Sequence, residues 1–193
     1  MSLENLSAAI ETLDDSQPRD AATRDLFPEV LPNAGNDDEN QRYTIRRALG
    51  WVMQKVGILG FTLDVAACRA AHVAKHWYGP EQPHPELRDG LQRIWFGDTF
   101  NNPPWSDIEP WVVKAWAEWR NGTCTSIAML LPGSRRHSKW WQEHVEPYRD
   151  RPGSPLRTFE PPERFPYGNP SNPLGVGCPE PNFTSVLLVW KDW

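Results

Sequence analysis

The tetrapeptide Asn102-Pro103-Pro104-Trp105 constrains the fold more than any other stretch of this sequence. It follows the apolar and aromatic residues 94–101, which predict a short buried strand, and it precedes residues 108–119, whose apolar side chains recur at helical spacing. Two consecutive prolines fix φ and supply no N–H group, while their carbonyl groups stay free to accept hydrogen bonds. Because open α/β sheets bind ligands where strands end, the sequence predicts a ligand-binding crevice at this junction.

The chemistry that suits this tetrapeptide is methylation of an exocyclic amine on a nucleobase. Such an amine is a poor nucleophile because its lone pair is delocalised into the ring. The side-chain oxygen of Asn102 and the carbonyl of Pro103 would each accept one N–H, which stabilises the charge that develops during attack. Trp105 would stack on a base that has left the duplex. The alternative is a Pro-Pro turn with a packing tryptophan.

A second strand with a polar end precedes the tetrapeptide. Residues 61–65 form a strand by β-propensity, and residues 66–71 form a small-residue turn where a backbone can approach a ligand closely. The segment is similar to the first strand and turn of a nucleotide-binding fold, although it carries no glycine-rich fingerprint. Asp64 at the strand end would orient an amine or hydroxyl group of a ligand. The alternative for Asp64 is a helix cap or a solvated carboxylate.

The remaining pattern predicts a single α/β domain. An amphipathic helix begins near Thr44, which is expected to cap it, and a polar, proline-rich stretch at residues 74–89 is typical of a loop. Further helices are predicted at residues 108–119 and 140–145, and further strands at residues 124–131, 156–159 and 183–190.

Length and charge limit the class of protein. A chain of 193 residues builds one α/β domain with a real core. We expect an N-terminal helix and linker at residues 1–40 and the main domain at residues 41–193, although residues 1–40 fit a cap over the core or a dimer contact equally well. The net charge of −5 argues against a broad nucleic-acid surface. No signal peptide and no apolar run long enough to cross a bilayer are apparent.

One stretch of the chain is dense in basic residues. Residues 134–139 contain Arg135, Arg136 and Lys139 and follow the end of a predicted strand. Contacts to DNA phosphates and an ordinary solvated loop are both open for these side chains.

Cysteine and histidine patterns predict no metal site. Three cysteines, widely separated and odd in number, indicate a reduced intracellular protein. The histidines His72, His76 and His84 lack the neighbouring cysteines or carboxylates that metal ligation needs.

With these blocks in order, the sequence resembles phage-type DNA N6-adenine methyltransferases of the Dam family. The resemblance rests on three blocks and covers about residues 40–190. The blocks are Phe61-Thr62-Leu63-Asp64-Val65-Ala66-Ala67; Asp89-Gly90-Leu91 with Phe100-Asn101-Asn102-Pro103-Pro104-Trp105; and Leu130-Leu131-Pro132, Trp140-Trp141 and Thr184-Ser185-Val186-Leu187-Leu188-Val189.

The resemblance implies a Rossmann-like methyltransferase fold, a mostly parallel sheet with helices on both faces, with S-adenosylmethionine as methyl donor and DNA as substrate. By position, Asp64 and the backbone of Ala66, Ala67 and Cys68 would hold the amino-acid end of the donor. Asp89 would approach the adenosine of the donor. A phage or prophage origin would place the protein in the bacterial cytoplasm.

Two positions depart from the pattern of the family. The family has an aromatic residue, a threonine and a proline near the donor, where this chain has Tyr43, Thr44 and Ile45. The resemblance therefore implies donor contacts for Tyr43 and Thr44. Trp105 replaces the commoner tyrosine, and both rings can stack on a base.

Three other functions remain open from sequence. The N4 amine of cytosine poses the same chemical problem as the N6 amine of adenine. A catalytically inactive nucleic-acid-binding or inhibitory protein of the same fold would bind the donor without transferring the methyl group. An interaction module rich in tryptophan and proline would fit residues 151–182 but not the ordered strand-turn blocks. The sequence carries no signal for the oligomeric state.

Overall fold

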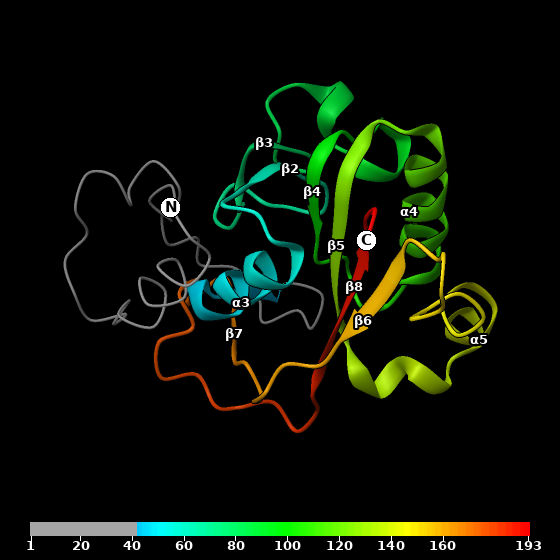
Figure 1. Cartoon of the computed structure of the whole chain (residues 1–193). Coiled ribbons are helices and arrows are strands. Elements are labelled where there is room, and N and C mark those ends of the chain that lie inside the picture. The colour runs from blue at the N-terminus through cyan, green and yellow to red at the C-terminus, as the bar shows by residue number, and fades with distance from the viewer. Residues whose placement is uncertain (1–41) are drawn as a thin grey trace.

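The computed structural model describes residues 42–193, which form a six-stranded sheet with helices packed against it (Figure 1). The strand order is β3-β2-β4-β5-β8-β6. The strands are β2 Phe61–Asp64, β3 Ala74–Trp77, β4 Gly97–Asn101, β5 Cys124–Pro132, β6 Leu156–Phe159 and β8 Ser185–Trp190. The α-helices of these residues are α3 Arg46–Val56, α4 Glu109–Asn121 and α5 Lys139–His144. Short 3-10 helices lie at Pro85–Leu87, Gly90–Gln92 and Gly133–His137.

The pairing of the strands creates one reversal of strand order. β2 pairs in parallel with β3 on one side and with β4 on the other, and β4 pairs in parallel with β5. β8 runs antiparallel to both of its neighbours, β5 and β6. The chain therefore moves outward from β2 to β3 and then returns to β4 across β2. Such a switch point leaves a crevice at the carboxyl ends of the two strands. The prediction of a mostly parallel sheet is confirmed.

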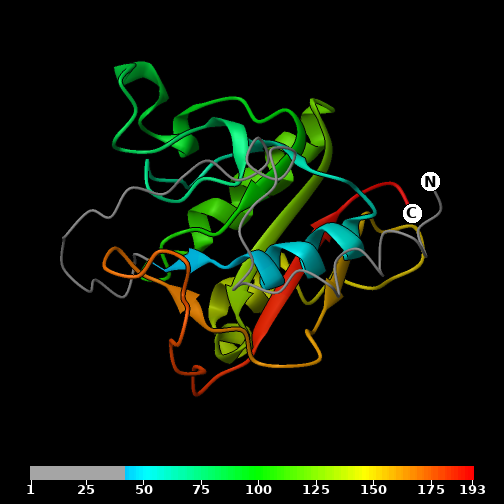
Figure 2. The ribbon, with the colours of Figure 1, turned by 90° about the vertical axis from the view of Figure 1, so that its left-hand side faces the viewer.

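The sheet is covered on both faces, as expected. Along β5, alternate side chains belong to two separate apolar clusters, because successive side chains of a strand point to opposite faces. Ile127 and Met129 pack with α4 and α5, whereas Ala128 and Leu130 pack with α3. Figures 1 and 2 show α3 and α4 on opposite sides of the sheet.

Most of the predicted elements are present within one to three residues of their expected bounds. The expected strand at residues 156–159 coincides with β6, and the strands at residues 61–65, 124–131 and 183–190 correspond to β2, β5 and β8. Gly122 ends α4 with a φ of 71°, a left-handed conformation that glycine adopts without strain.

Three expectations about local structure were wrong. Residues 74–89 contain β3, an edge strand in which Lys75 and His76 are exposed, so its composition resembles that of a loop. The strand before the tetrapeptide begins at Gly97, and Ile94 is 65% exposed. Thr44 does not cap a helix; it lies in β1 (Tyr43–Thr44), and Ile45 precedes α3.

A small second sheet joins the beginning of the described chain to its last quarter. β1 pairs antiparallel with β7, Tyr167–Gly168. The chain folds back tightly after β7, because a Cβ atom at Gly168 would lie 2.2 Å from the carbonyl oxygen of Pro173. β7 and the loop after it therefore lie beside the start of α3, as Figure 2 shows.

The expected N-terminal helix and linker at residues 1–40 lie outside the residues that the structure describes. Within residues 42–193, no helix has the length and apolar character needed to span a bilayer. Cys68, Cys124 and Cys178 are all free thiols.

Candidate active site

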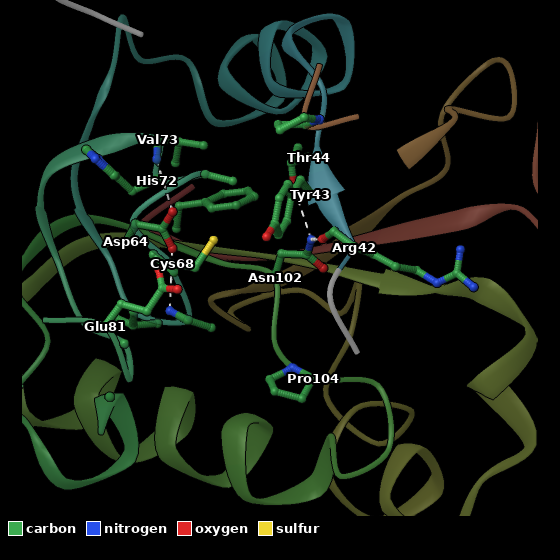
Figure 3. Close-up of a pocket in the computed structure, with 18 of the residues that line it drawn as sticks. Arg42, Tyr43, Thr44, Asp64, Cys68, His72, Val73, Glu81, Asn102 and Pro104 are labelled. Atoms are coloured by element: carbon green, nitrogen blue, oxygen red, sulfur yellow. Dashed lines mark hydrogen bonds between the residues drawn. The ribbon is translucent and has the colours of Figure 1, made fainter. Parts of the chain in front are cut away.

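A cavity of about 380 Å³ lies at the carboxyl ends of β2 and β4 (Figure 3). Asp64 ends β2, and Asn102 directly follows β4; both side chains line the cavity. The parallel register of the two strands pairs Asp64 with Phe100, which brings the two strand ends together. Asp64 and Asn102 therefore face one cavity, at the junction where the sequence predicts a ligand-binding crevice.

Asp64 is a buried carboxylate in the wall of this cavity. The residue is 3% exposed, and its carboxylate accepts N–H groups from the backbone of Val73 at 3.1 Å and of Ala66 at 3.4 Å. Burial raises the pKa of Asp64 to about 7, and these two hydrogen bonds offset only part of that effect. A cationic group entering the cavity would restore the ionised form.

The turn after β2 brings backbone groups to the cavity. Ala66, Ala67 and Cys68 all line it. Gly79 and Gly90 also line it and lie directly against this turn. A Cβ atom at Gly79 would lie 1.8 Å from the carbonyl oxygen of Ala67, and one at Gly90 would lie 2.0 Å from that of Val65. Glycine at both positions lets residues 79–90 close one side of the cavity.

Asp89 lines the same side of the cavity as Gly90. Its Oδ1 accepts the backbone N–H of Leu91 at 2.9 Å and so caps the 3-10 helix Gly90–Gln92. The carboxylate is exposed, as a group that contacts a polar part of a ligand would be.

The amide of Asn102 has a defined orientation. Its Nδ2 donates to the carbonyl oxygen of Arg42 at 2.7 Å and to Oγ1 of Thr44 at 3.1 Å. Its Oδ1 accepts the indole N–H of Trp105 at 3.3 Å. A carbonyl group only accepts and an indole N–H only donates, so the partners of the amide determine which end is oxygen. The second lone pair of Oδ1 remains for a ligand.

The other residues of the tetrapeptide differ in position. Pro104 lines the cavity, but neither Pro103 nor Trp105 does. Trp105 makes T-shaped contacts with Tyr167 and Phe183, with ring centroids 5.0 and 5.3 Å away. The guanidinium carbon of Arg42 lies 5.1 Å from the centroid of the Trp105 ring. Trp105 is thus a half-buried residue beside the cavity, and the Arg42 cation already lies over its ring.

Tyr43 and Thr44 line the cavity from β1. Burial, followed by a hydrogen bond with the Cys68 thiol, raises the pKa of the Tyr43 hydroxyl above its ordinary value. Burial likewise raises the pKa of Cys68. Both groups therefore stay neutral at physiological pH and form an uncharged part of the wall.

The basic stretch lies after β5, in the 3-10 helix Gly133–His137 and the start of α5. Arg135 is exposed, Arg136 donates to Glu160 at 2.6 Å, and Lys139 lies 3.5 Å from Glu143. None of the three basic side chains lines the cavity. Because β5 and β4 run parallel, this stretch begins at the same edge of the sheet as the tetrapeptide.

Sequence reasoning missed several parts of the cavity wall. Glu81 lies in the stretch predicted as loop, and its carboxylate accepts the backbone N–H of Arg69 at 2.7 Å. Pro173 and Leu174 come from the loop after β7. No periodicity or motif in residues 151–182 signals this contact, because it depends on the pairing of β1 with β7.

One group of side chains in residues 42–193 has the spacing of a metal site, and it lies outside the cavity. Glu109, Glu143 and His144 place their ligand atoms within 4.8 Å of one another on α4 and α5. None of His72, His76 and His84 belongs to this group. His76 and His84 are exposed, whereas His72 is half-buried and lines the cavity.

The sheet and the cavity at its switch point define an α/β protein with a cavity at the carboxyl ends of adjacent parallel strands, the place where sheets of this kind bind their ligands. The model of the family described as DNA N-6-adenine-methyltransferase (Dam) matches residues 38–149. The chain belongs to this family, as its resemblance indicated. No curated protein and no solved structure matches the chain. The matched segment includes Asp64 and Asn102 but ends before β6, β7 and β8.

The raised pKa of Asp64 predicts a specific pH dependence of stability. A carboxyl group with a higher pKa in the folded protein than in the unfolded chain binds more protons when folded, so its contribution to stability falls as pH rises between the two values. Relative to Asp64→Asn, the wild-type protein should therefore lose stability between about pH 4 and pH 7. Urea unfolding of both proteins across this range measures the difference. A difference that stays constant with pH would show that Asp64 has an ordinary pKa.

Proposed function

We propose that this protein transfers the methyl group of S-adenosylmethionine to the N6 amine of adenine in DNA. The observation that supports this function best is the Asn102 amide, whose oxygen end is determined by its partners, in a cavity that also contains the buried carboxylate of Asp64. The oxygen of Asn102 suits the amine that would accept the methyl group, and the carboxylate of Asp64 suits a cationic methyl donor.

The residues of the cavity fit a donor of this kind. S-adenosylmethionine carries an ammonium group and supplies an electrophilic methyl group on a sulfonium centre. Asp64 would bind the ammonium group, since a cation restores the charge that burial disfavours. The backbone of Ala66, Ala67 and Cys68 would hold the rest of the amino-acid end, and Asp89 would accept hydrogen bonds from the adenosine.

The sheet topology also supports a Rossmann-like methyltransferase fold. In such folds the ligand binds where strand order reverses, and here β2 and β4 form that point. α3 begins at the same cavity, since Thr44, Ile45 and Arg46 line it.

Asn102 would act on the acceptor amine. Its Oδ1 and the carbonyl of Pro103 would accept the two N–H groups of the amine. As the nitrogen bonds to the methyl carbon and the carbon–sulfur bond breaks, positive charge builds on the nitrogen, and both acceptors stabilise it. The electron pair of the broken bond stays on the sulfur, and the amine then loses one proton to water to give the neutral product. The hydrogen bond to Asn102 would thus stabilise the transition state more than the ground state.

Trp105 would stack on the extruded base, as its flat ring allows. In the structure the guanidinium of Arg42 lies over the Trp105 ring, so a base that stacks on that face must displace Arg42. Tyr167 and Phe183 pack against the indole in T-shaped contacts. Pro104, which lines the cavity, would form part of the passage between base and donor.

Replacing Asn102 tests the proposed chemistry. Asn102→Ala should lower the single-turnover rate of methyl transfer by about 100- to 1,000-fold, because the variant has no preorganised acceptor at this position. Donor affinity should change little. Asn121→Ala, which removes an exposed amide at the end of α4, should keep the wild-type rate.

Mass spectrometry of nucleosides from DNA incubated with protein and donor identifies the product. N6-methyladenine supports the proposal, whereas N4-methylcytosine would keep the mechanism and change the target. Wild-type protein that binds donor and DNA but yields no methylated base would instead be an inactive binder.

Calorimetry with the donor tests the role of Asp64. Wild-type affinity for S-adenosylmethionine should rise between about pH 5 and pH 7, as the carboxyl group ionises, and binding should release protons in this range. Asp64→Asn should bind more weakly and without this pH dependence, because a neutral amide does not titrate and forms no ion pair with the ammonium group. The control is Asp192→Asn, which changes an exposed carboxylate. Equal affinities of the wild type and Asp64→Asn would remove Asp64 from the donor site.

The basic stretch is proposed to contact DNA phosphates beside the target base. Replacing Arg135, Arg136 and Lys139 with Ala should weaken DNA binding to a similar extent for different sequences. The slope of log K against log salt should become shallower by about 0.9 for each phosphate that the variant no longer neutralises. Fluorescence anisotropy over a range of salt concentrations measures this slope.

A charge-matched control keeps net charge out of the comparison. Replacing the exposed Arg93, Arg120 and Arg151 with Ala removes the same three charges from other parts of the surface. This control should keep the wild-type salt slope. Equal slopes for both triple variants would show that the basic stretch is ordinary solvated surface.

A further inference from the structure

The orientation of the Asn102 amide is set from outside the tetrapeptide. The last torsion of an asparagine side chain is broad and roughly two-fold, so the side chain by itself does not choose which end faces the ligand. A reversed amide would point its N–H groups at the target amine. The N–H groups of the amine would then face other donors instead of an acceptor. Methyl transfer by the proposed mechanism therefore requires groups that hold Nδ2 away from the target base.

β1 and the residue before it supply those groups. The carbonyl oxygen of Arg42 and the hydroxyl oxygen of Thr44 accept the two N–H groups of Nδ2, at 2.7 and 3.1 Å (Figure 3). On the other side, the indole of Trp105 donates to Oδ1 at 3.3 Å. Of the two acceptors, only Thr44 uses its side chain, so its contribution alone can be removed by substitution.

The position of Thr44 depends on the last quarter of the chain. Thr44 pairs with Tyr167 in the two-stranded sheet of β1 and β7. The ring of Tyr167 packs against Trp105, and its hydroxyl group lies 2.6 Å from that of Ser185 at the start of β8. The two residues that bond the amide from opposite ends, Thr44 and Trp105, are therefore both held by β7.

We propose that Thr44 is a positioning residue for methyl transfer, whose hydroxyl oxygen holds Nδ2 of Asn102 and so directs Oδ1 toward the acceptor amine. This inference rests on the proposed function, since it concerns the group that would receive the amine. It differs from the donor contact that the resemblance implied for Thr44. The residue acts on the rate of the chemical step through Asn102, not on the binding of the donor.

The test compares Thr44→Val with Thr44→Ser. Valine keeps the shape of threonine and suits a strand but removes the acceptor, whereas serine keeps the hydroxyl group. Thr44→Val should lower the single-turnover rate by about 3- to 10-fold, which corresponds to the loss of one hydrogen bond while that to Arg42 remains. Thr44→Ser should restore most of the rate. Donor and DNA affinities, measured by calorimetry and anisotropy, should stay at wild-type values in both variants.

Two further proteins separate positioning from a general effect on the fold. Thr62→Val is the matched control, because Thr62 lies in β2 outside the cavity and also accepts a hydrogen bond, from the N–H of Asp98 at 3.3 Å. It should keep the wild-type rate. In an Asn102→Ala background, Thr44→Val should cause no further loss, because the group that Thr44 positions is already absent.

The outcomes separate this inference from the proposed function. If wild-type protein methylates adenine and Thr44→Val is as fast as Thr62→Val, the proposed function stands and the positioning role is wrong. A fall in donor affinity that matches the fall in rate would also overturn it, because Thr44 would then be a donor contact. If wild-type protein transfers no methyl group, the proposed function fails and this inference fails with it.

Discussion

The parallel pairing of β2 with β4 determines where the two central polar groups of the site, Asp64 and Asn102, lie. Strands that run in the same direction end at the same edge of the sheet, so the carboxylate at the end of β2 and the amide after β4 reach one cavity. Along the chain, β3 comes after β2 and before β4, but in the sheet it lies on the far side of β2. The chain must therefore return across the end of β2 to reach β4. Glycines at positions 79 and 90 make that close passage possible.

The two central polar groups of the cavity, Asp64 and Asn102, differ in how far the protein satisfies their hydrogen-bonding and charge requirements. Asp64 is buried among backbone N–H groups that do not fully compensate its charge, so a cationic ligand would stabilise it. The Asn102 amide is saturated at its nitrogen end and only partly used at its oxygen end. The first group suits a positively charged donor, and the second suits a hydrogen-bond donor such as an amine. This division corresponds to the two substrates that a DNA adenine methyltransferase brings together.

The part of the chain beyond the family match also contributes to the site. β7 holds β1 in place, Tyr167 and Phe183 support Trp105, and Leu174 closes part of the cavity. β8 and β6 complete the sheet through antiparallel pairing. The cavity is therefore assembled from both the matched segment and the proline- and glycine-rich residues that follow it.

The sequence by itself determined the elements whose signals are local. The apolar runs of β2, β5 and β8, the helical spacing of α4 and the polar ends of β2 and β4 all follow from neighbouring residues.

The tertiary structure decided what depends on distant contacts. Thr44 accepts a hydrogen bond from Asn102, which lies 58 residues further along the chain. The neighbours of Thr44 suggested a helix cap, which was wrong because they carry no signal of this distant contact. β3 looked like loop because an edge strand with two exposed residues needs little apolar sequence. Periodicity reports which face of an element is buried, whereas packing decides which element covers it.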